Sequence, residues 1–462
     1  MDIYKVKKLT RTENITVEVP GSKSITNRAL LLAALSEGTV TLNGALFSDD
    51  SRHFLSSLIS LGFKVETDEK EQRIRVQGKG GAIPNREGTV DVGSAGTAAR
   101  FITAMLGLSE GCYTINSSEQ MKKRPMEPIF KALEDIGAEF EYLLEPYHLP
   151  VRVKGCGYKK EDKASGRPMA SVNQENEYCN LKKPERAAFT HITLDTNEST
   201  QYLSAMLMTG VMNSGGIAIH VTGDRKTGSY VDITRKVMED FGFKSEYRDE
   251  TYFICGDERY RNGDFTYQIE PDVSAACYFY GIGALLGIKA TVKNVHFNST
   301  QGDIQFIRVL EKMGCTVSDD IQGIGVKGPT DGKKLKGISA DMKTFSDQAL
   351  TLAAVSIFAE GDTNICNIGH IRKQESDRLS VMAAELGRMG IKCEEKEDSI
   401  IIHPGMPSPC LVETYDDHRV AMAFTLVGLK CGDIGIKSPM CCRKTFENYF
   451  DLIEGLYLQD NK

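Results

Sequence analysis

The sequence of 462 residues contains no tryptophan, no basic excess and no long apolar run. Its 56 Lys and Arg against 63 Asp and Glu leave a net charge of −7, which argues against a nucleic-acid-binding protein because such domains are normally basic. No apolar stretch approaches the roughly 18–20 residues that cross a bilayer. The first residues lack the apolar segment of a signal peptide. We therefore expect a cytoplasmic globular protein of two or more domains.

Twelve cysteines are present, but they lack the spacing of a metal or disulfide framework. No CxxC pair occurs, and no histidine stands at a zinc-finger distance from a pair of cysteines. Without an export signal, the cysteines of a long chain are expected to stay reduced. We predict reduced, mostly buried thiols and no structural metal.

Two interleaved repeats run through the chain. In five segments an amphipathic helix precedes a glycine and a short strand, and these glycines are Gly62, Gly137, Gly242, Gly314 and Gly390. The pattern predicts outer helices that end at a glycine in the left-handed conformation. In six other segments, a small polar residue opens a helix that is apolar on nearly all sides, with the markers Thr26, Thr97, Thr200, Ser274, Asp347 and Asp417. These six helices should be buried and begin with Ser, Thr or Asp N-caps.

The repeat is about 72 residues long, since successive markers are 70–74 residues apart with one exception. The exception is longer by about 31 residues, and the excess lies in a polar, charged stretch near residues 155–187. We expect this stretch to be a surface insertion. Six units of two helices and several strands predict an α/β protein. If the units divide three and three, the domain boundary falls near residue 268.

The starts of the buried helices also carry cations. Arg28, Arg100 and Arg419 each follow such a start by about one turn. Because a helix N-terminus presents free N–H groups and a positive dipole, an arginine beside it makes an anion site. Further cations at equivalent repeat positions are Arg124, Arg378 and Lys444. In a site for phosphate and carboxylate groups, Asp347 and Glu375 are the candidates for proton transfer, although Asp347 taken alone would be an N-cap.

The motifs around these residues resemble those of the 5-enolpyruvylshikimate-3-phosphate (EPSP) synthase family, in order and with the expected spacing from about residue 18 to 455. The matching segments are GSKSITNRA from Gly21, GSAGTAAR from Gly93, KRPM from Lys123, STQ from Ser199, ESDR from Glu375, YDDHR from Tyr415 and KTF from Lys444. Each motif alone is weak, whereas the full set is specific.

The resemblance implies a two-domain inside-out α/β barrel of six βαβαββ repeats, three per domain, with parallel helices inside and strands outside. Residues 22–268 would form the first domain, and residues 1–21 with 269–462 would form the second. The helix N-termini of both domains would face the cleft between them and add to its positive field.

The implied reaction transfers the enolpyruvyl group of phosphoenolpyruvate to the 5-hydroxyl of shikimate 3-phosphate and releases phosphate through a tetrahedral adduct. It is a step of chorismate and aromatic amino acid biosynthesis. The resemblance implies no metal and no other cofactor. The partners would be these two small-molecule substrates, with no nucleic acid and no membrane. The chain would be a monomer that stands alone rather than one module of a longer enzyme.

Carried over residue by residue, the resemblance divides the site into two halves. For shikimate 3-phosphate it implies Lys23, Ser24, Arg28, Ser199, Thr200, Gln201, Thr227, Asp347 and Gln374, with support from Tyr230. For phosphoenolpyruvate it implies Lys23, Gly96, Arg124, Gln201, Arg378, Arg419 and Lys444. Asp347 would accept the 5-hydroxyl proton, and Glu375 with Lys23 would manage the proton at C3. His418 would have a structural hydrogen-bonding role.

Several positions depart from the family's pattern. Gln374 stands where a lysine is expected to contact the shikimate hydroxyls and Asp347. Glutamine can hydrogen-bond but brings no charge. Its neighbour Lys373 is expected to point elsewhere unless the loop shifts. Ser94 and His370 stand where asparagine is common.

Two other functions stay open. UDP-N-acetylglucosamine enolpyruvyl transferases share the fold and the phosphoenolpyruvate chemistry. They would have asparagine after the early lysine and a cysteine in a loop near residue 115, where this chain has Ser24 and no cysteine. A non-catalytic sugar-phosphate-binding relative is suggested by Gln374, and the full set of charged residues argues against it.

Overall fold

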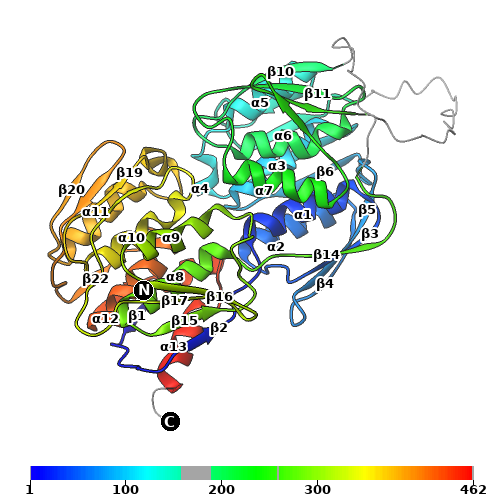
Figure 1. Ribbon diagram of the computed structural model, residues 1–462. Helices are drawn as coiled ribbons and strands as arrows, with labels where there is room; N and C mark the ends of the chain where they lie inside the picture. Colours follow the sequence, from blue (N-terminus) through cyan, green and yellow to red (C-terminus); the bar gives the residue numbers. More distant parts are fainter. Residues whose placement is uncertain (1, 158–188, 257–259, 460–462) are drawn as a thin grey trace, which may run out of the picture.

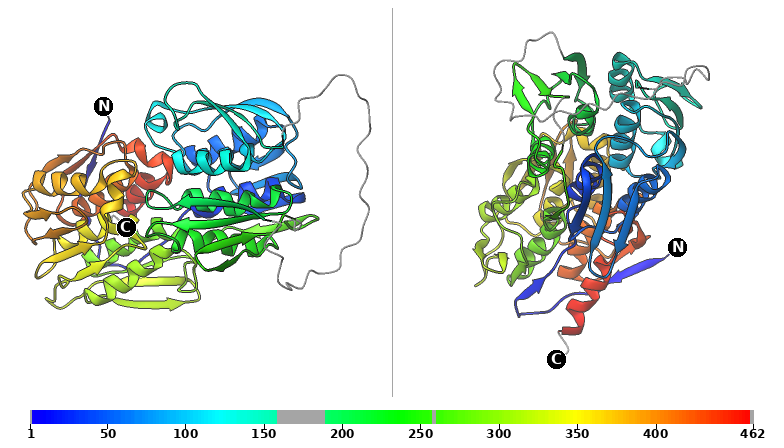
Figure 2. Two further views of the ribbon diagram at one scale, coloured as in Figure 1. Left: turned by 90° about the horizontal axis from the view of Figure 1, so that it is seen from above. Right: turned by 90° about the vertical axis from the view of Figure 1, so that its right-hand side faces the viewer.

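The computed structural model describes residues 2–157, 189–256 and 260–459, so nearly all of the insertion expected at 155–187 lies outside the described residues. The chain forms two lobes of helices and sheets (Figures 1 and 2), and the mixed α/β class is confirmed. None of the helices in these ranges combines the length and the hydropathy needed to span a bilayer. The eleven cysteines in the described ranges are free thiols, but only four are buried and seven are half-buried, so the prediction of mostly buried thiols was wrong.

Six sheets are present in the described residues, and five of them repeat one pattern of a parallel pair followed by two antiparallel pairs. The first sheet has the strand order β14 (Phe265–Gln268), β3 (Glu37–Asn43), β5 (Arg73–Lys79), β4 (Lys64–Asp68). The second has the order β6 (Glu87–Asp91), β7 (Cys112–Asn116), β9 (Val151–Lys154), β8 (Glu139–Tyr142). The third has the order β10 (Thr190–Asp195), β11 (Ile217–Thr222), β13 (Thr251–Ile254), β12 (Glu246–Arg248). The others are β2 (Ile15–Val17), β15 (Lys289–Val292), β17 (Gly323–Lys327), β16 (Thr316–Asp320); β18 (Ser339–Asp341), β19 (Thr363–Cys366), β21 (Ile400–Ile402), β20 (Cys393–Glu395); and the three-stranded β1 (Ile3–Val6), β23 (Ile434–Lys437), β22 (Cys410–Val412).

Three of these sheets are completed by strands from distant parts of the chain. Strand β1 pairs antiparallel with β23. Strand β14 pairs in parallel with β3, and β2 pairs in parallel with β15. The two segments that connect the lobes therefore lie side by side, joined by backbone hydrogen bonds of 2.8 Å from Ser22 to Glu270 and from Asp272 to Pro20.

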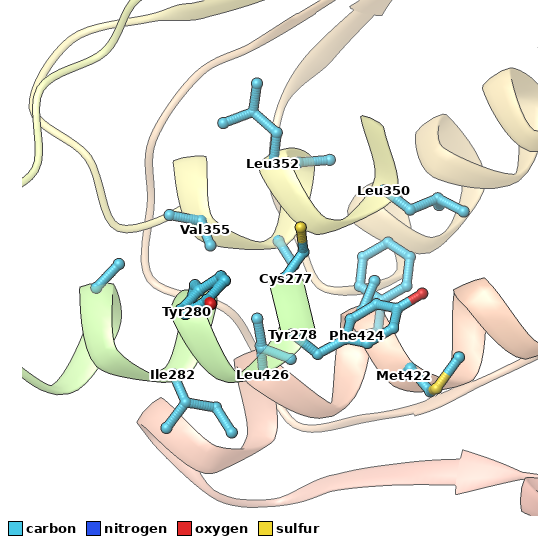
Figure 3. Close-up of a cluster of buried hydrophobic side chains, with 14 of the residues drawn as sticks. Cys277, Tyr278, Tyr280, Ile282, Leu350, Leu352, Val355, Met422, Phe424 and Leu426 are labelled. Carbon is cyan, nitrogen blue, oxygen red and sulfur yellow. The ribbon is translucent and has the colours of Figure 1, made fainter. Parts of the chain in front are cut away.

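The six apolar helices are buried along almost their whole length, as predicted. They are α1 (Lys23–Leu35), α3 (Gly96–Gly107), α6 (Gln201–Thr209), α8 (Val273–Leu286), α10 (Ala349–Ser356) and α12 (His418–Cys431). The first three belong to one hydrophobic core and the last three to another. Figure 3 shows side chains of α8, α10 and α12 meeting in the second core, among them Cys277, Leu350 and Phe424.

The five amphipathic helices also form where the repeat predicts them. They are α2 (Asp49–Ser60), α5 (Glu127–Ile136), α7 (Ser229–Asp240), α9 (Gln305–Lys312) and α11 (Arg378–Arg388). All five predicted glycines have positive φ, between 75° and 106°, which confirms the left-handed position after each helix. The remaining helical segments in the described ranges are α4 (Glu119–Lys122), α13 (Tyr449–Gln459), η1 (Gly210–Met212), η2 (Gly302–Ile304), η3 (Ser346–Gln348), η4 (Gly369–Lys373) and η5 (Pro439–Lys444).

The predicted capping of the buried helices was largely wrong. Side-chain caps are present only at α8 and α12, where Asp272 and Asp417 accept bonds from the helix backbone. The residue before α3 is Ala95, and the residues before α1, α6 and α10 make no side-chain cap. Four buried helices therefore lack a side-chain bond from their own N-cap residue, although the first N–H of α1 donates to Asp272 and that of α6 donates to Ser199. The other N–H groups of these first turns are available to an anion.

The close approach of α8 to its sheet is testable at Gly283. A Cβ there would lie 2.5 Å from the carbonyl oxygen of Val326 and 2.9 Å from the Cβ of Ala290. Gly283→Ala should therefore destabilise the fold by about 1–3 kcal/mol, because α8 must shift. In α13, nothing lies within 4 Å of a Cβ at Gly455, so Gly455→Ala should stabilise the fold by about 0.5–1 kcal/mol. Urea unfolding followed by circular dichroism compares the two variants, and equal effects would contradict the close packing.

Candidate active site

A cavity of about 580 Å³ opens where helix starts of the two lobes meet. One lobe contributes the starts of α1, α3, α6 and α7, and the other contributes those of α8, α11 and α12 together with η3. Thirteen of the fifteen predicted site residues line it: Lys23, Ser24, Arg28, Gly96, Arg124, Ser199, Thr200, Gln201, Asp347, Gln374, Glu375, Arg378 and Arg419. Thr227 lines a smaller adjoining cavity of about 50 Å³. Lys444 lies next to the main cavity, with its Nζ 3.9 Å from the Glu375 carboxylate.

Asp347 is held by cations on one side and by a phenol from the other lobe. Arg378 and Arg419 donate to its two carboxylate oxygens at 3.0 and 2.8 Å, and the hydroxyl of Tyr230 donates at 2.5 Å. Burial alone would raise the pKa of Asp347, but the two guanidinium groups outweigh it and hold the pKa below its usual range. Asp347 is therefore ionised in this arrangement and a weak base.

Arg378 also binds a second carboxylate, that of Asp417, which is fully buried. Its Nε and Nη2 donate to the two oxygens of Asp417 at 2.8 and 3.3 Å. Asp417 also accepts the backbone N–H of Arg419 at the start of α12. The YDDHR motif contained Asp417, but the sequence did not reveal that this residue fixes the direction of Arg378, 39 positions away.

Glu375 lies in a second charged group with His418 and Lys444. The Nδ1 of His418 is 3.1 Å from the Glu375 carboxylate, and His418 is only 2% exposed. Burial would raise the pKa of Glu375, but His418 and Lys23 hold it well below the usual value. The structural hydrogen-bonding role expected for His418 agrees with this contact.

The atoms of Glu375, Asp417 and His418 lie within 4.8 Å of one another, a spacing that a metal ion could use. Arg378, however, already occupies both oxygens of Asp417, and Lys444 lies beside Glu375. Two fixed positive charges at this group disfavour a cation. The group therefore fits an ion-pair network better than a metal site.

Two arginines meet at the start of α3 without a carboxylate partner. A Cβ at Gly96 would lie 2.7 Å from Nη1 of Arg124 and 2.9 Å from Nη1 of Arg100, so only glycine leaves room for both. Burial, and then the charge of Arg100, lower the pKa of Arg124 to about 10. Among the described residues, neither arginine forms an ion pair with a carboxylate. Arg100 was recognised as a cation at a helix start but was not among the predicted binding residues.

Lys23 and Arg28, on α1, differ in how many of their groups are free for a ligand. The Nζ of Lys23 is 3.4 Å from the Asp50 carboxylate, and its amine also faces the cavity. The buried guanidinium of Arg28 donates instead to Thr234 at 2.7 Å, to Ser204 at 3.1 Å and to the carbonyl of Ser24 at 2.9 Å. Arg28 is thus engaged mainly with the protein.

The expectation that Lys373 points away from the site was wrong. Lys373 lines the cavity beside Gln374, and its Nζ is 2.8 Å from the carboxylate of Glu198 on the other lobe. The short turn η4 ends at Lys373, and Gln374 has a non-helical backbone, so two successive side chains reach the cavity. Sequence spacing alone could not show this, because the direction of both side chains depends on the backbone of this turn.

Comparisons with known proteins agree over nearly the whole chain. The model of the family EPSP synthase (3-phosphoshikimate 1-carboxyvinyltransferase) matches residues 8–173 and 168–453. Proteins named 3-phosphoshikimate 1-carboxyvinyltransferase are similar to it: that of Trichormus variabilis is 38% identical over 97% of this chain and 98% of the relative. The chloroplastic protein of Brassica napus is 35% identical, over 95% and 82%.

The fold comparison points the same way. A solved EPSP synthase from Acinetobacter baumannii, 24% identical, superposes with a TM-score of 0.75 over 98% of both chains, which shows a common fold. The family match and the identities above 30% confirm the resemblance found in the motifs. This chain belongs to the EPSP synthase family.

Proposed function

We propose that the cavity between the lobes is the active site for the reaction of this family, the transfer of the enolpyruvyl group of phosphoenolpyruvate to the 5-hydroxyl of shikimate 3-phosphate. The main support is the pair of the buried Arg100 and the half-buried Arg124, whose side chains line the cavity without a carboxylate in an ion pair with either among the described residues. Such a pair needs an anion, because burying uncompensated charge is costly. Both substrates are anions with phosphate and carboxylate groups.

Phosphoenolpyruvate would bind on the side of the cavity where the guanidinium groups gather. Its phosphate and carboxylate suit the forked donors of Arg124, Arg378 and Arg419, which bind such groups with two parallel hydrogen bonds. The uncapped start of α3 at Gly96 adds backbone N–H groups. Lys444, Lys23 and Gln201 complete this half.

Shikimate 3-phosphate would bind on the side where hydroxyl groups gather. Ser199, Thr200 and Thr227 surround the starts of α6 and α7. Ser24, Arg28, Gln201 and Gln374 face the same half, although Gln374 replaces a charged lysine of the family pattern. Hydroxyl and amide donors suit a sugar-like ring with a phosphate on it.

The proton transfers would belong to Asp347 and to Glu375 with Lys23. The 5-hydroxyl adds to C2 of phosphoenolpyruvate, Asp347 accepts its proton, and C3 gains a proton from the Glu375–Lys23 side. In the second step C3 loses a proton and the C2–O bond to phosphate breaks, which restores the double bond. Bound substrate anions would share Arg378 and Arg419, so the pKa of Asp347 would rise towards that of a useful base.

The two hydrophobic cores support a division into two domains, residues 22–268 and residues 1–21 with 269–462, each built as three βαβαββ units around central helices. This inside-out barrel would bring six helix starts to one cleft. We further propose that the chain acts as a monomer in the cytoplasm, because both halves of the site come from one chain.

The function is tested by phosphate release from phosphoenolpyruvate. Purified protein should release phosphate only when shikimate 3-phosphate is also present, because the hydroxyl must attack before phosphate can leave. Release with UDP-N-acetylglucosamine as acceptor would favour the related transferase instead. Release of phosphate in the absence of any acceptor would contradict the proposal. So would a failure to release phosphate with either acceptor.

The role of Asp347 is tested by Asp347→Asn, which keeps the size but removes the base and leaves one oxygen in place of the two that accept from Arg378, Arg419 and Tyr230. The turnover number should fall by roughly 100-fold or more, while the KM of each substrate changes only a few-fold. Asp240→Asn is a matched control, because Asp240 forms an ion pair with Lys236 away from the cavity. A turnover number equal to that of the control would remove Asp347 from the mechanism.

A further inference from the structure

Arg225 is a charged residue of the cavity wall to which neither the motifs nor the family resemblance assigns a role. It lies between β11 and α7, in the loop that also carries Thr227. Its side chain is half-buried and lines both the main cavity and the smaller one beside it. Within the described ranges, no carboxylate lies within 4.0 Å of its guanidinium group. A cation placed in this way has no fixed counter-charge.

The smaller cavity is lined by groups that donate hydrogen bonds. The hydroxyls of Thr200, Thr227 and Ser346 lie in its wall. Helices α6 and α7 begin there, and neither N-cap residue bonds its helix through a side chain, although the first N–H of α6 donates to Ser199. The cavity of about 50 Å³ is close in size to a single small polar group. Hydroxyls, free helix N–H groups and a guanidinium together match the oxygens of a phosphate.

Three carboxylates lie in the same wall, those of Asp224, Asp303 and Asp347, and the last two are already engaged with other partners. Asp347 pairs with Arg378 and Arg419, and Asp303 accepts a hydrogen bond from Gln348 at 2.9 Å. Asp347 and Asp303 are thus poorly placed to neutralise Arg225.

The positive charge of Arg225 also affects the pKa of a neighbouring histidine, His370. His370 is 2.7 Å from the hydroxyl of Ser346, and burial, followed by the charge of Arg225, lowers the pKa of His370 to about 4. His370 is therefore neutral near pH 7. The positive charge of this corner then comes from Arg225 and from the exposed Lys343.

We propose that Arg225 binds the 3-phosphate of shikimate 3-phosphate in the smaller cavity. The proposal rests on the function proposed above and assigns one more residue to its substrate. Gln374 leaves the hydroxyl end of the shikimate half one positive charge short of the family pattern, and Arg225 would add a charge at a different point, the phosphate. Arg28 is less available to the phosphate, because its guanidinium donates to Thr234, Ser204 and the carbonyl of Ser24.

The test is Arg225→Gln in the full-length protein, with isothermal titration of shikimate 3-phosphate and steady-state kinetics. The dissociation constant for shikimate 3-phosphate should rise about 10- to 100-fold, as expected for loss of a charged hydrogen bond. Arg225→Lys should recover part of this loss, because it restores the charge without the fork. The KM for phosphoenolpyruvate, measured at saturating shikimate 3-phosphate, should stay within about threefold.

Lys226→Gln is the matched control. It removes a positive charge from the same loop, but Lys226 pairs with Glu250 at 2.6 Å and lines neither cavity. Its dissociation constant should equal that of the unchanged protein. The assignment would be overturned if Arg225→Gln left the dissociation constant for shikimate 3-phosphate unchanged. It would also be overturned if Arg225→Gln weakened the binding of both substrates equally and Arg225→Lys recovered none of the loss. Absence of binding by the unchanged protein would instead overturn the proposed function itself.

Discussion

The carboxylate of Asp347 is shared by two buried guanidinium groups, and the arrangement of the cavity depends on this shared ion pair. Moving a guanidinium group out of water costs about several kcal/mol, as it does for other ions, unless a partner charge and hydrogen bonds replace the water. Arg378 meets this need with Asp347 and the fully buried Asp417, and Arg419 meets it with Asp347. Tyr230 donates to the same carboxylate from the other lobe. One ionised side chain thus joins the cations of one lobe to the helix starts of the other.

The fold concentrates positive charge that the composition conceals. The whole chain carries −7, yet Arg100 and Arg124 meet at the start of α3 with no carboxylate partner in the described residues. Apolar helices make this arrangement workable, because they can be buried completely and still present their N-termini to one cavity. Four of these starts have no bond from the N-cap side chain, and apart from the bonds from Lys23 to Asp272 and from Gln201 to Ser199, their first-turn N–H groups are left for ligands.

Much of the fold could be predicted from the sequence, because it follows from periodicity. The buried helices and the five left-handed glycines needed only the apolar pattern and the 72-residue repeat. Capping could not be predicted in this way: whether Thr200 caps its helix or faces the cavity depends on tertiary packing. The same holds for Asp417 and Arg378, whose contact spans 39 residues, and for Lys373, whose direction is set by the turn η4. The motifs selected residues of which most line one cavity, but they could not show which cations were already paired.

The central claim is that two small anions bind in one cavity, with shikimate 3-phosphate on the hydroxyl side and phosphoenolpyruvate on the side of the guanidinium pair. The most direct measurement is a crystal structure of the protein with shikimate 3-phosphate bound. The account predicts density for its phosphate between Thr200, Thr227 and Arg225, and its 5-hydroxyl within hydrogen-bonding distance of Asp347. Density for the phosphate against Arg100 and Arg124, or outside the cavity, would contradict it.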